Sequence, residues 1–264
     1  MNLNNLEILD VLEKNFGLDP KSSKVLIVGL GNTGISVAHY LNKLGFKFAV
    51  TDSREKPPLK DVLYNEMPDI PVFTNGFDDA AFKVATHLIV SPGVSMNEKT
   101  IHKAIVNGSK TLSDIDLFIC SVKAPIIAIT GSNGKSTVTT MVGDMATCAG
   151  RKVAVGGNLG TPVLDLLEEE AELFVLELSS FQLERAMGLN AVAATILNIS
   201  ADHLDRHVNM ANYAKEKQRI FNGDGVMVIN IDDPIVNAMQ ETNRCVFTFS
   251  IKRSADFHID RKNN

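Results

Sequence analysis

Residues 126–137 carry the side-chain types that bind nucleotide phosphates. Ile126 to Thr130 form an apolar run rich in β-branched side chains, and a glycine-containing turn follows it. Backbone N–H groups in such a turn can point at phosphate oxygens, a lysine ammonium neutralises β/γ charge, and a hydroxyl group can bind Mg²⁺. The pattern therefore predicts a nucleoside triphosphate site formed by Gly131, Ser132, Asn133, Gly134, Lys135, Ser136 and Thr137.

This segment departs from the standard phosphate-loop sequence at one position. The standard pattern, G-x-x-x-x-G-K-[ST], has glycine where this chain has Ile129. A glycine turn that merely joins a buried strand to a helix, with Lys135 in solvent, is therefore the alternative interpretation of the segment taken alone.

A second glycine-rich turn lies nearer the N-terminus. The apolar run 25–28 leads into the turn 29–34 (GLGNTG), a helical pattern through Leu44, and a strand pattern from Phe46 to Thr51 that ends at Asp52. This order is typical of a βαβ unit in which glycines let a diphosphate approach a helix N-terminus. The pattern does not distinguish the diphosphate of NAD, FAD or a UDP-sugar.

Two residues near this turn have a functional and a plain interpretation. Arg54 follows Asp52 by two residues and could bind a base or a phosphate, or lie in solvent. Ser91 begins a turn after the apolar run 87–90, at the carboxyl end of an expected strand. Ligands bind at that edge of open α/β sheets, so Ser91 could form a second wall of the same site or belong only to a turn.

An acid and two basic residues in the second half are further candidates. Glu177 lies near the end of the apolar strand pattern 173–178, where a buried carboxylate is costly without a cation such as Mg²⁺. The apolar run 191–197 delivers His203 to the ligand edge of the sheet, whereas His207 is expected to be structural or on the surface. Lys217, in a helical pattern from Asn209 to Phe221, is not distinguished by spacing from an ordinary solvated lysine.

Composition indicates a globular protein of a reducing compartment. The chain has 264 residues, of which 45% are hydrophobic and 22% charged, and its net charge is −5. No basic run is present, so we expect no nucleic-acid partner. Cys120, Cys148 and Cys245 are widely spaced and predict no disulfide or metal site. No signal peptide or membrane-spanning segment is expected, which favours the cytoplasm.

The order of elements predicts an α/β protein with two domains. We place a Rossmann-like domain with a leading helix (3–16) in residues 1–122 and a phosphate-loop ATPase domain in residues 123–264, divided near Pro125. The second domain should hold a parallel sheet. Its remaining expected elements are helix 135–149, strand 152–155, loop 156–160, helix 162–169 and strand 256–260, and the lack of a following helix suggests that the domain is incomplete.

Five segments together resemble a known family. They are residues 130–137 (TGSNGKST), 157–160 (GNLG), 177–184 (ELSSFQLE), 202–206 (DHLDR) and 213–221 (YAKEKQRIF). In this order they are similar to the motifs of the Mur ligases, and the segment 177–184 points to the member that adds D-glutamate. The resemblance implies a cell-wall enzyme that uses ATP to join D-glutamate to UDP-N-acetylmuramoyl-L-alanine through an acyl phosphate.

The same resemblance implies roles for individual residues. Residues 131–137 would hold ATP, and Lys135, His203 and Lys217 would be catalytic. Two Mg²⁺ ions would be bound by Ser136, Glu177, His203 and a carbamylated Lys217. Asn158 and Gln182 would contact the muramoyl-alanine part, and the UDP part would be bound by Asn32, Thr33, Asp52, Ser53, Arg54 and Ser91.

The resemblance also defines what the chain would lack. The family has a C-terminal domain that supplies much of the D-glutamate site, and this sequence stops at Asn264. We therefore expect a monomeric fragment with weak or no turnover, because the parts that exclude water are missing. The alternatives are an NAD(P)-dependent oxidoreductase, which only the turn 29–34 and Asp52 favour, and a non-catalytic nucleotide-binding module.

Overall fold

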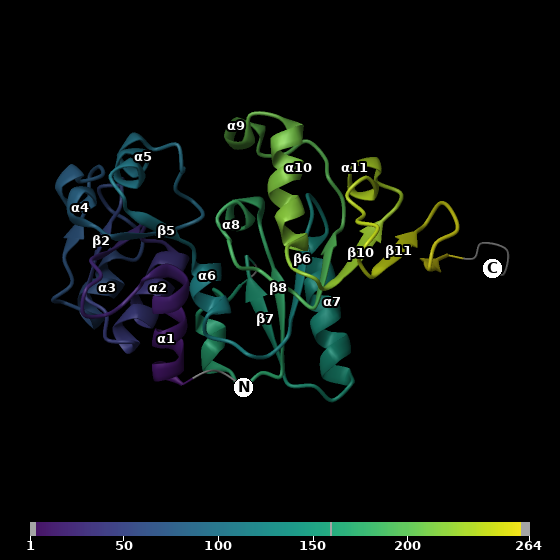
Figure 1. The fold of residues 1–264 in the computed structure, drawn as a ribbon, viewed down its shortest axis with the longest axis horizontal. Helices are drawn as coiled ribbons and strands as arrows, with labels where there is room; N and C mark the ends of the chain where they lie inside the picture. The colour runs from purple at the N-terminus through teal and green to yellow at the C-terminus, as the bar shows by residue number, and fades with distance from the viewer. Residues whose placement is uncertain (1–3, 159, 260–264) are drawn as a thin grey trace. The chain divides into compact units, whose positions relative to one another are not determined.

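The computed structural model describes residues 4–158 and 160–259, which fold into two compact units (Figure 1). The N-terminal unit contains the described residues up to Val122 together with Pro162–Leu167, and the C-terminal unit contains the rest. No helix among the described residues is long and apolar enough to cross a membrane.

The N-terminal unit is built on a five-stranded sheet of order β3-β2-β1-β4-β5, in which all pairs are parallel. All residues of β1 and β4 are buried, as expected when helices cover both faces of a parallel sheet. The strands are β1 (Val25–Val28), β2 (Phe48–Thr51), β3 (Val72–Phe73), β4 (His87–Val90) and β5 (Lys110–Leu112). The helices are α1 (Asn5–Phe16), α2 (Asn32–Lys43), α3 (Lys60–Glu66), α4 (Asp79–Val84), α5 (Lys99–Val106) and α6 (Asp114–Ile119).

Helix α1 begins and ends where local chemistry dictates. The Asn4 side chain accepts a hydrogen bond from the Glu7 backbone N–H, and the Glu7 side chain accepts one from Asn4 in return. This capping box gives hydrogen-bond acceptors to two backbone N–H groups that have no partner within the helix. Gly17 ends the helix in the left-handed conformation, at φ 68°. The predicted helix 3–16 is thus confirmed from residue 5 onward, and Leu3 lies outside the described residues.

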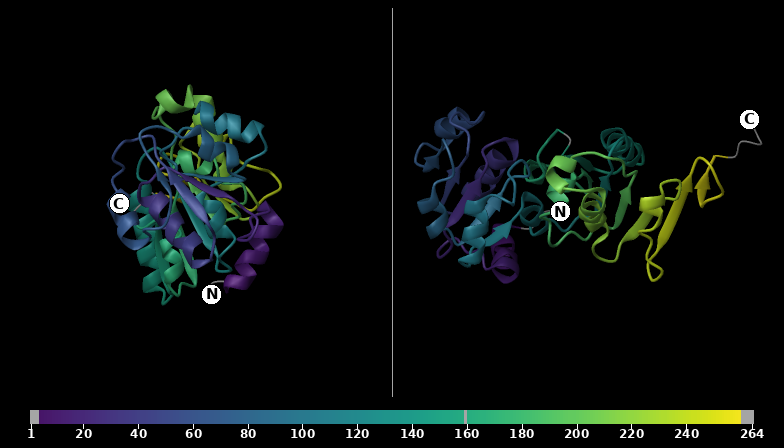
Figure 2. Two further views of the ribbon diagram at one scale, coloured as in Figure 1. Left: turned by 90° about the vertical axis from the view of Figure 1, so that its left-hand side faces the viewer. Right: turned by 90° about the horizontal axis from the view of Figure 1, so that it is seen from above.

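The C-terminal unit contains a seven-stranded sheet of order β12-β11-β10-β9-β6-β8-β7, also entirely parallel. Figure 2 shows its last strands, in yellow, at one edge. The strands are β6 (Ile126–Thr130), β7 (Val153–Gly157), β8 (Leu173–Glu177), β9 (Ala193–Ile196), β10 (Val226–Asn230), β11 (Val246–Ser250) and β12 (Phe257–His258). The helical elements are α7 (Lys135–Cys148), α8 (Ser180–Leu183), α9 (Leu204–His207), α10 (Met210–Gln218), η2 (Arg219–Phe221) and α11 (Pro234–Asn237). The short element η1 (Asp165–Glu168) belongs, apart from Glu168, to the N-terminal unit.

The order of the parallel strands brings the segments that follow β6, β8 and β9 to the same end of this sheet. β6 is the central neighbour of both β8 and β9, so the carboxyl ends of all three strands lie together. The α/β fold with parallel sheets that the sequence predicts is confirmed.

One local prediction is wrong, and the bounds of two others differ from the structure. The helix expected over 162–169 is only the short 3₁₀ turn η1, because tertiary burial of Val163, Leu164 and Leu166 overrides the local helical pattern. The predicted loop 156–160 begins later, since β7 continues through Gly157, and residue 159 lies outside the described residues. The strand expected over 256–260 shortens to β12, and Asp260 is not described.

A glycine substitution tests the packing of the first glycine turn. A Cβ atom at Gly34 would lie 2.1 Å from the Gly29 carbonyl oxygen, a backbone atom that cannot move aside. Gly34→Ala should therefore lower the free energy of unfolding by about 1–3 kcal/mol, measured by urea titration with circular dichroism. Gly31→Ala is the matched control, because a Cβ there meets nothing within 4 Å. Equal urea midpoints for the two variants would contradict this packing.

Candidate nucleotide-binding site

The loop between β6 and α7 leaves a helix N-terminus without a side-chain cap. Gly134 is the N-cap residue of α7, adopts φ 81°, and offers no side chain to the first-turn N–H groups. These groups and the helix dipole favour an anion at this position. Ser136 and Thr137 are exposed on the first turn, and Lys135 is half-buried with its Nζ donating to the Ser132 carbonyl at 3.0 Å.

Hydrogen bonds fix the loop to the segment that follows β9. The backbone N–H groups of Ser132 and Asn133 donate to the carbonyl and the side-chain oxygen of Asn198, each at 2.9 Å. Asn198 donates back to the Asn133 carbonyl at 3.0 Å, and Ser200 N–H donates to Ser132 Oγ at 2.9 Å. The amides of residues 132 and 133 are thus engaged, which leaves those around Gly134 to Ser136 for a phosphate. Sequence reasoning placed Asn198 directly after a strand but assigned it no role, because a polar residue at that position has no distinctive spacing.

Glu177 is the centre of the site, and two predicted residues contact it. Its side chain is buried, with the residue 1% exposed, and its Oε2 accepts a hydrogen bond from Ser136 Oγ at 2.8 Å. Its Oε1 accepts from Asn158 Nδ2 at 2.6 Å. Gly157 permits the approach of β7, since a Cβ there would lie 2.4 Å from the Glu177 carbonyl oxygen. The structure therefore brings Ser136, Asn158 and Glu177 together beside the α7 N-terminus.

The donor atoms of this cluster fit a magnesium ion bound mainly by its nucleotide. A carboxylate and a hydroxyl are hard oxygen ligands, which Mg²⁺ prefers, and Mg²⁺ usually completes its shell with phosphate oxygens and water. Among the described residues, no group of three or more His, Cys, Asp or Glu side chains could hold a metal by itself. Glu177 and Ser136 would thus hold the ion only together with a phosphate.

Lys217 lies buried on the other side of the loop. The residue is 1% exposed, and its Nζ donates to the Gly131 carbonyl at 2.9 Å and to Thr130 Oγ1 at 3.2 Å. Burial, with a smaller contribution from the charge of Lys135, lowers the pKa of Lys217 to about 7, although Asp202 and Glu177 oppose the shift. A large fraction of this amine is therefore neutral near neutral pH.

The two histidines have different surroundings. His203 is half-exposed, adopts φ 52° before α9, and its Nε2 lies 3.4 Å from Asp202 Oδ2. His207 is buried, its Nε2 lies 2.9 Å from Ser180 Oγ, and its ring stacks on Phe181 at a centroid distance of 5.2 Å. Burial lowers the pKa of His207. These contacts give His207 a structural role and leave His203 open to a ligand.

Gln182 has a structural contact that sequence reasoning did not predict. Its Oε1 accepts hydrogen bonds from the backbone N–H and the hydroxyl of Ser179, at 3.1 and 3.0 Å, in the capping box of α8. The carbonyl end of this side chain therefore stabilises the helix start, and only its amide nitrogen is oriented for a further role.

The glycine turn of the N-terminal unit forms a second candidate site. Asp52 is buried and accepts hydrogen bonds from Leu30 N–H at 2.7 Å and from Arg54 N, Nε and Nη2 at 2.9, 2.8 and 2.7 Å. Burial alone would raise the pKa of Asp52, but the hydrogen bonds from Arg54 and Leu30 outweigh it and lower that pKa. Ser91 Oγ donates to the Gly29 carbonyl at 3.0 Å, so it also contacts this turn.

The remaining predicted residues of this turn lie around its edge. Asn32 and Thr33 begin α2, whose N-cap Gly31 makes no side-chain cap hydrogen bond. Ser53 is exposed between Asp52 and Arg54. The arrangement offers another uncapped helix N-terminus and a guanidinium group, both of which suit a diphosphate.

Comparison with known proteins identifies similar families and relatives. Residues 129–264 match the Mur ligase middle domain, and residues 23–113 match the Mur ligase MurD-like N-terminal domain. The UDP-N-acetylmuramoylalanine--D-glutamate ligase of Methylococcus capsulatus is 52% identical over 235 residues, which are 89% of this chain and 51% of that protein. The protein of the same name from Marinobacter nauticus is 50% identical over 87% of this chain and 52% of its own length. The chain thus spans about half the length of these relatives.

Solved structures of lower identity share the fold. A UDP-N-acetylmuramate:L-alanyl-gamma-D-glutamyl-meso-diaminopimelate ligase from Neisseria meningitides aligns with a TM-score of 0.58 at 19% identity, over 86% of this chain and 78% of its own. A murein peptide ligase from Psychrobacter arcticus aligns with a TM-score of 0.56 at 17% identity, over 90% and 55%. At these identities the likeness supports the fold alone.

The lowered pKa of Lys217 predicts a pH dependence of stability. The unfolded chain binds this proton up to the ordinary lysine pKa of 10.5, whereas the folded protein releases it near pH 7. Because the unfolded state then binds more protons, this group makes the free energy of unfolding rise between about pH 7 and 10.5. Lys217→Met should remove that part of the rise in CO₂-free urea titrations.

Lys215→Met is the matched control for this measurement, since Lys215 lies exposed on the same helix. It should keep the pH dependence of the wild type. The same slope in Lys217→Met and wild type would show that the Lys217 amine is charged in the folded protein.

Proposed function

Since the chain belongs to the Mur ligase family, we propose that it carries the nucleotide-binding and UDP-substrate-binding parts of a ligase that adds D-glutamate to UDP-N-acetylmuramoyl-L-alanine. The names of the relatives that match it support this assignment. In the proposed reaction the alanyl carboxylate attacks the γ-phosphorus of ATP and releases ADP. The amine of D-glutamate then attacks the resulting acyl phosphate, which releases phosphate and forms the amide. We place this monomeric enzyme in the cytoplasm.

The proposal divides the two ligand sites between two domains. Residues 1–122 would bind the UDP-substrate and residues 123–264 would bind ATP. The family matches at 23–113 and 129–264 support this division. The chain spans about half the length of its relatives.

The observation that carries the ATP assignment is the cluster of Ser136, Glu177 and Asn158 beside an uncapped helix N-terminus. Amides of the first turn of α7 would donate to the β-phosphate. Lys135 would leave the Ser132 carbonyl and stabilise charge on the transferred phosphoryl group, as positioned cations do in phosphoryl transfer. Magnesium, when bound, would neutralise phosphate charge.

Lys217 is proposed to act after reaction with CO₂. The neutral amine would form an N–C bond to CO₂ and lose a proton, which converts a cation into a carbamate anion. Its lowered pKa and its burial support this step, because a protonated amine has no lone pair to donate. The carbamate and His203 would then hold a second Mg²⁺, which would supply further positive charge for the phosphates.

The UDP-substrate is proposed to bind along the glycine turn of the N-terminal unit. The uncapped α2 N-terminus would meet the diphosphate with Asn32 and Thr33. Arg54, which Asp52 holds in place, would contact the uridine side with Ser53. Ser91 would line the same turn. Asn158 and Gln182 would contact the muramoyl-alanine part.

The oxidoreductase alternative depends on Asp52, and the geometry does not favour it. In NAD-binding units the acid at the end of the second strand hydrogen-bonds the ribose hydroxyls. Here both carboxylate oxygens already accept hydrogen bonds from Leu30 and Arg54. A ribose would have to displace Arg54 from a buried acid.

Calorimetric titration of the chain with Mg-ATP tests the nucleotide assignment. Lys135→Ala should weaken binding about 10- to 100-fold, because a hydrogen bond to a charged group contributes about 1.5–3 kcal/mol. Lys152→Ala, an exposed lysine of the same unit, should bind like the wild type. Tight binding of NAD with no binding of Mg-ATP would contradict the proposal and favour the oxidoreductase.

Carbon-13 NMR with labelled bicarbonate tests the carbamylation of Lys217. A carbamate signal should appear above pH 7, where the amine is neutral, and weaken below it. The signal should be absent in Lys217→Ala and present in Lys215→Ala. A signal that persists in Lys217→Ala, or one that is missing from the wild type at alkaline pH, would refute the modification.

A further inference from the structure

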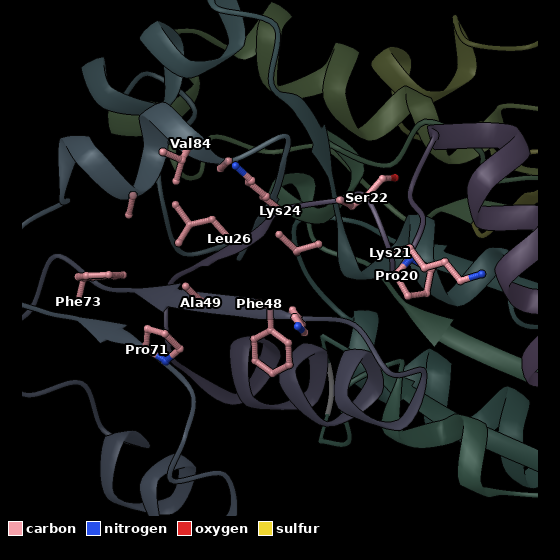
Figure 3. A pocket seen from close by; sticks show the side chains of 15 residues that line it. Pro20, Lys21, Ser22, Lys24, Leu26, Phe48, Ala49, Pro71, Phe73 and Val84 are labelled. Atoms are coloured by element: carbon pink, nitrogen blue, oxygen red, sulfur yellow. The ribbon is translucent and has the colours of Figure 1, made fainter.

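A cavity opens on the N-terminal unit, beside the first residues of β1 and β2. Its volume is about 410 Å³, which is within the usual range of small-molecule sites. It lies along the first residues of β1 and β2 and reaches Phe73 at the end of β3, whereas the glycine turn follows the carboxyl end of β1. Its floor is apolar and consists of Leu26, Ala49 and Phe73, and α4 contributes Ala81 and Val84 to one wall (Figure 3).

The topology of the sheet explains why this space is not filled. Leu26 and Val28 face a core formed with residues of α4 and α5, so these two helices cover that face of the sheet. Helix α4 connects β3 to β4 and has only six residues, too few to extend over the beginnings of β1 and β2. Ala49 adds little volume at the point where the helix ends.

The charge around the cavity has one sign. Lys21, Lys24 and Lys47 line it, all three are exposed, and none of the fifteen lining residues is acidic. In Figure 3 the Lys24 side chain extends toward Val84, while the Lys21 side chain points away from the cavity. An apolar floor with a cationic rim complements a ligand that has an apolar body and one anionic group.

We propose that this cavity binds a small amphiphilic carboxylate. The hydrocarbon body would lie on Leu26, Ala49 and Phe73, and the carboxylate would pair with the ammonium groups of Lys24 and Lys47. A nucleotide fits less well, because its several charges would face the apolar floor. The site uses none of the residues assigned to ATP or to the UDP-substrate, so it stands apart from the proposed function.

Calorimetric titration with decanoate, below its micelle concentration, tests this site. The wild type should bind one decanoate per chain with a saturable heat. Decyltrimethylammonium, which has the same alkyl chain and the opposite charge, should bind at least about tenfold more weakly if the lysine rim selects the anion. Absence of saturable decanoate binding, or equal affinity for both amphiphiles, would overturn the proposal.

Two variants locate the binding. Ala49→Leu fills the floor and should weaken decanoate binding about tenfold. Val84→Glu places a carboxylate near Lys24 at a position that is 58% exposed, and should weaken binding about threefold or more. Ala80→Leu and Lys99→Gln are matched controls at exposed positions outside the cavity, and both should bind like the wild type. Wild-type affinity in Ala49→Leu and Val84→Glu would show that decanoate binds elsewhere.

Discussion

The buried carboxylate of Glu177 is the constraint on which the nucleotide site depends. A carboxylate removed from water is stable only where hydrogen bonds or a cation compensate for lost hydration. Here the hydroxyl of Ser136 and the amide of Asn158 supply the hydrogen bonds, and each comes from a different crossover of the sheet. The parallel register places Glu177 beside Ile129, at the end of β6, so the acid lies next to the phosphate loop. Any slip of β8 by one residue would turn the carboxylate to the other face.

Lys217 is a second buried ionisable residue beside the loop between β6 and α7, which it contacts at Thr130 and Gly131. Its Nζ donates to Thr130 and Gly131, so the loop is held between an anion and an amine that are both buried. Glu177 favours the charged form of Lys217, but burial and Lys135 outweigh it and lower the pKa of Lys217 to about 7. A second positive charge is disfavoured beside Lys135. The same surroundings that would bind phosphate therefore keep the neighbouring amine ready to react.

Local patterns in the sequence were sufficient for the parts of the fold that depend on local chemistry. The β-branched run before Gly131, the glycine turn after Val28 and the stop at Gly17 each have one compatible structure, and each prediction is confirmed. The short strands β3 and β5 were not predicted, because two or three residues carry no periodic signal and form a strand only by pairing with a neighbour. The helix expected over 162–169 did not form for a different reason, because tertiary burial of its apolar residues overrides local propensity.

The residues of the nucleotide site also differ in whether the sequence alone could identify them. Lys135 and Glu177 were found from residue type and position, whereas Lys217 was found only through the family resemblance, and the anchoring by Asn198 was missed. The most direct test of the central claim is a crystal structure of this chain with magnesium and a non-hydrolysable ATP analogue. The account predicts the β-phosphate on the amides of residues 134–136, with the metal on Ser136 and Glu177 oxygens. Triphosphate density at the N-terminal glycine turn, or a metal away from Glu177, would contradict it.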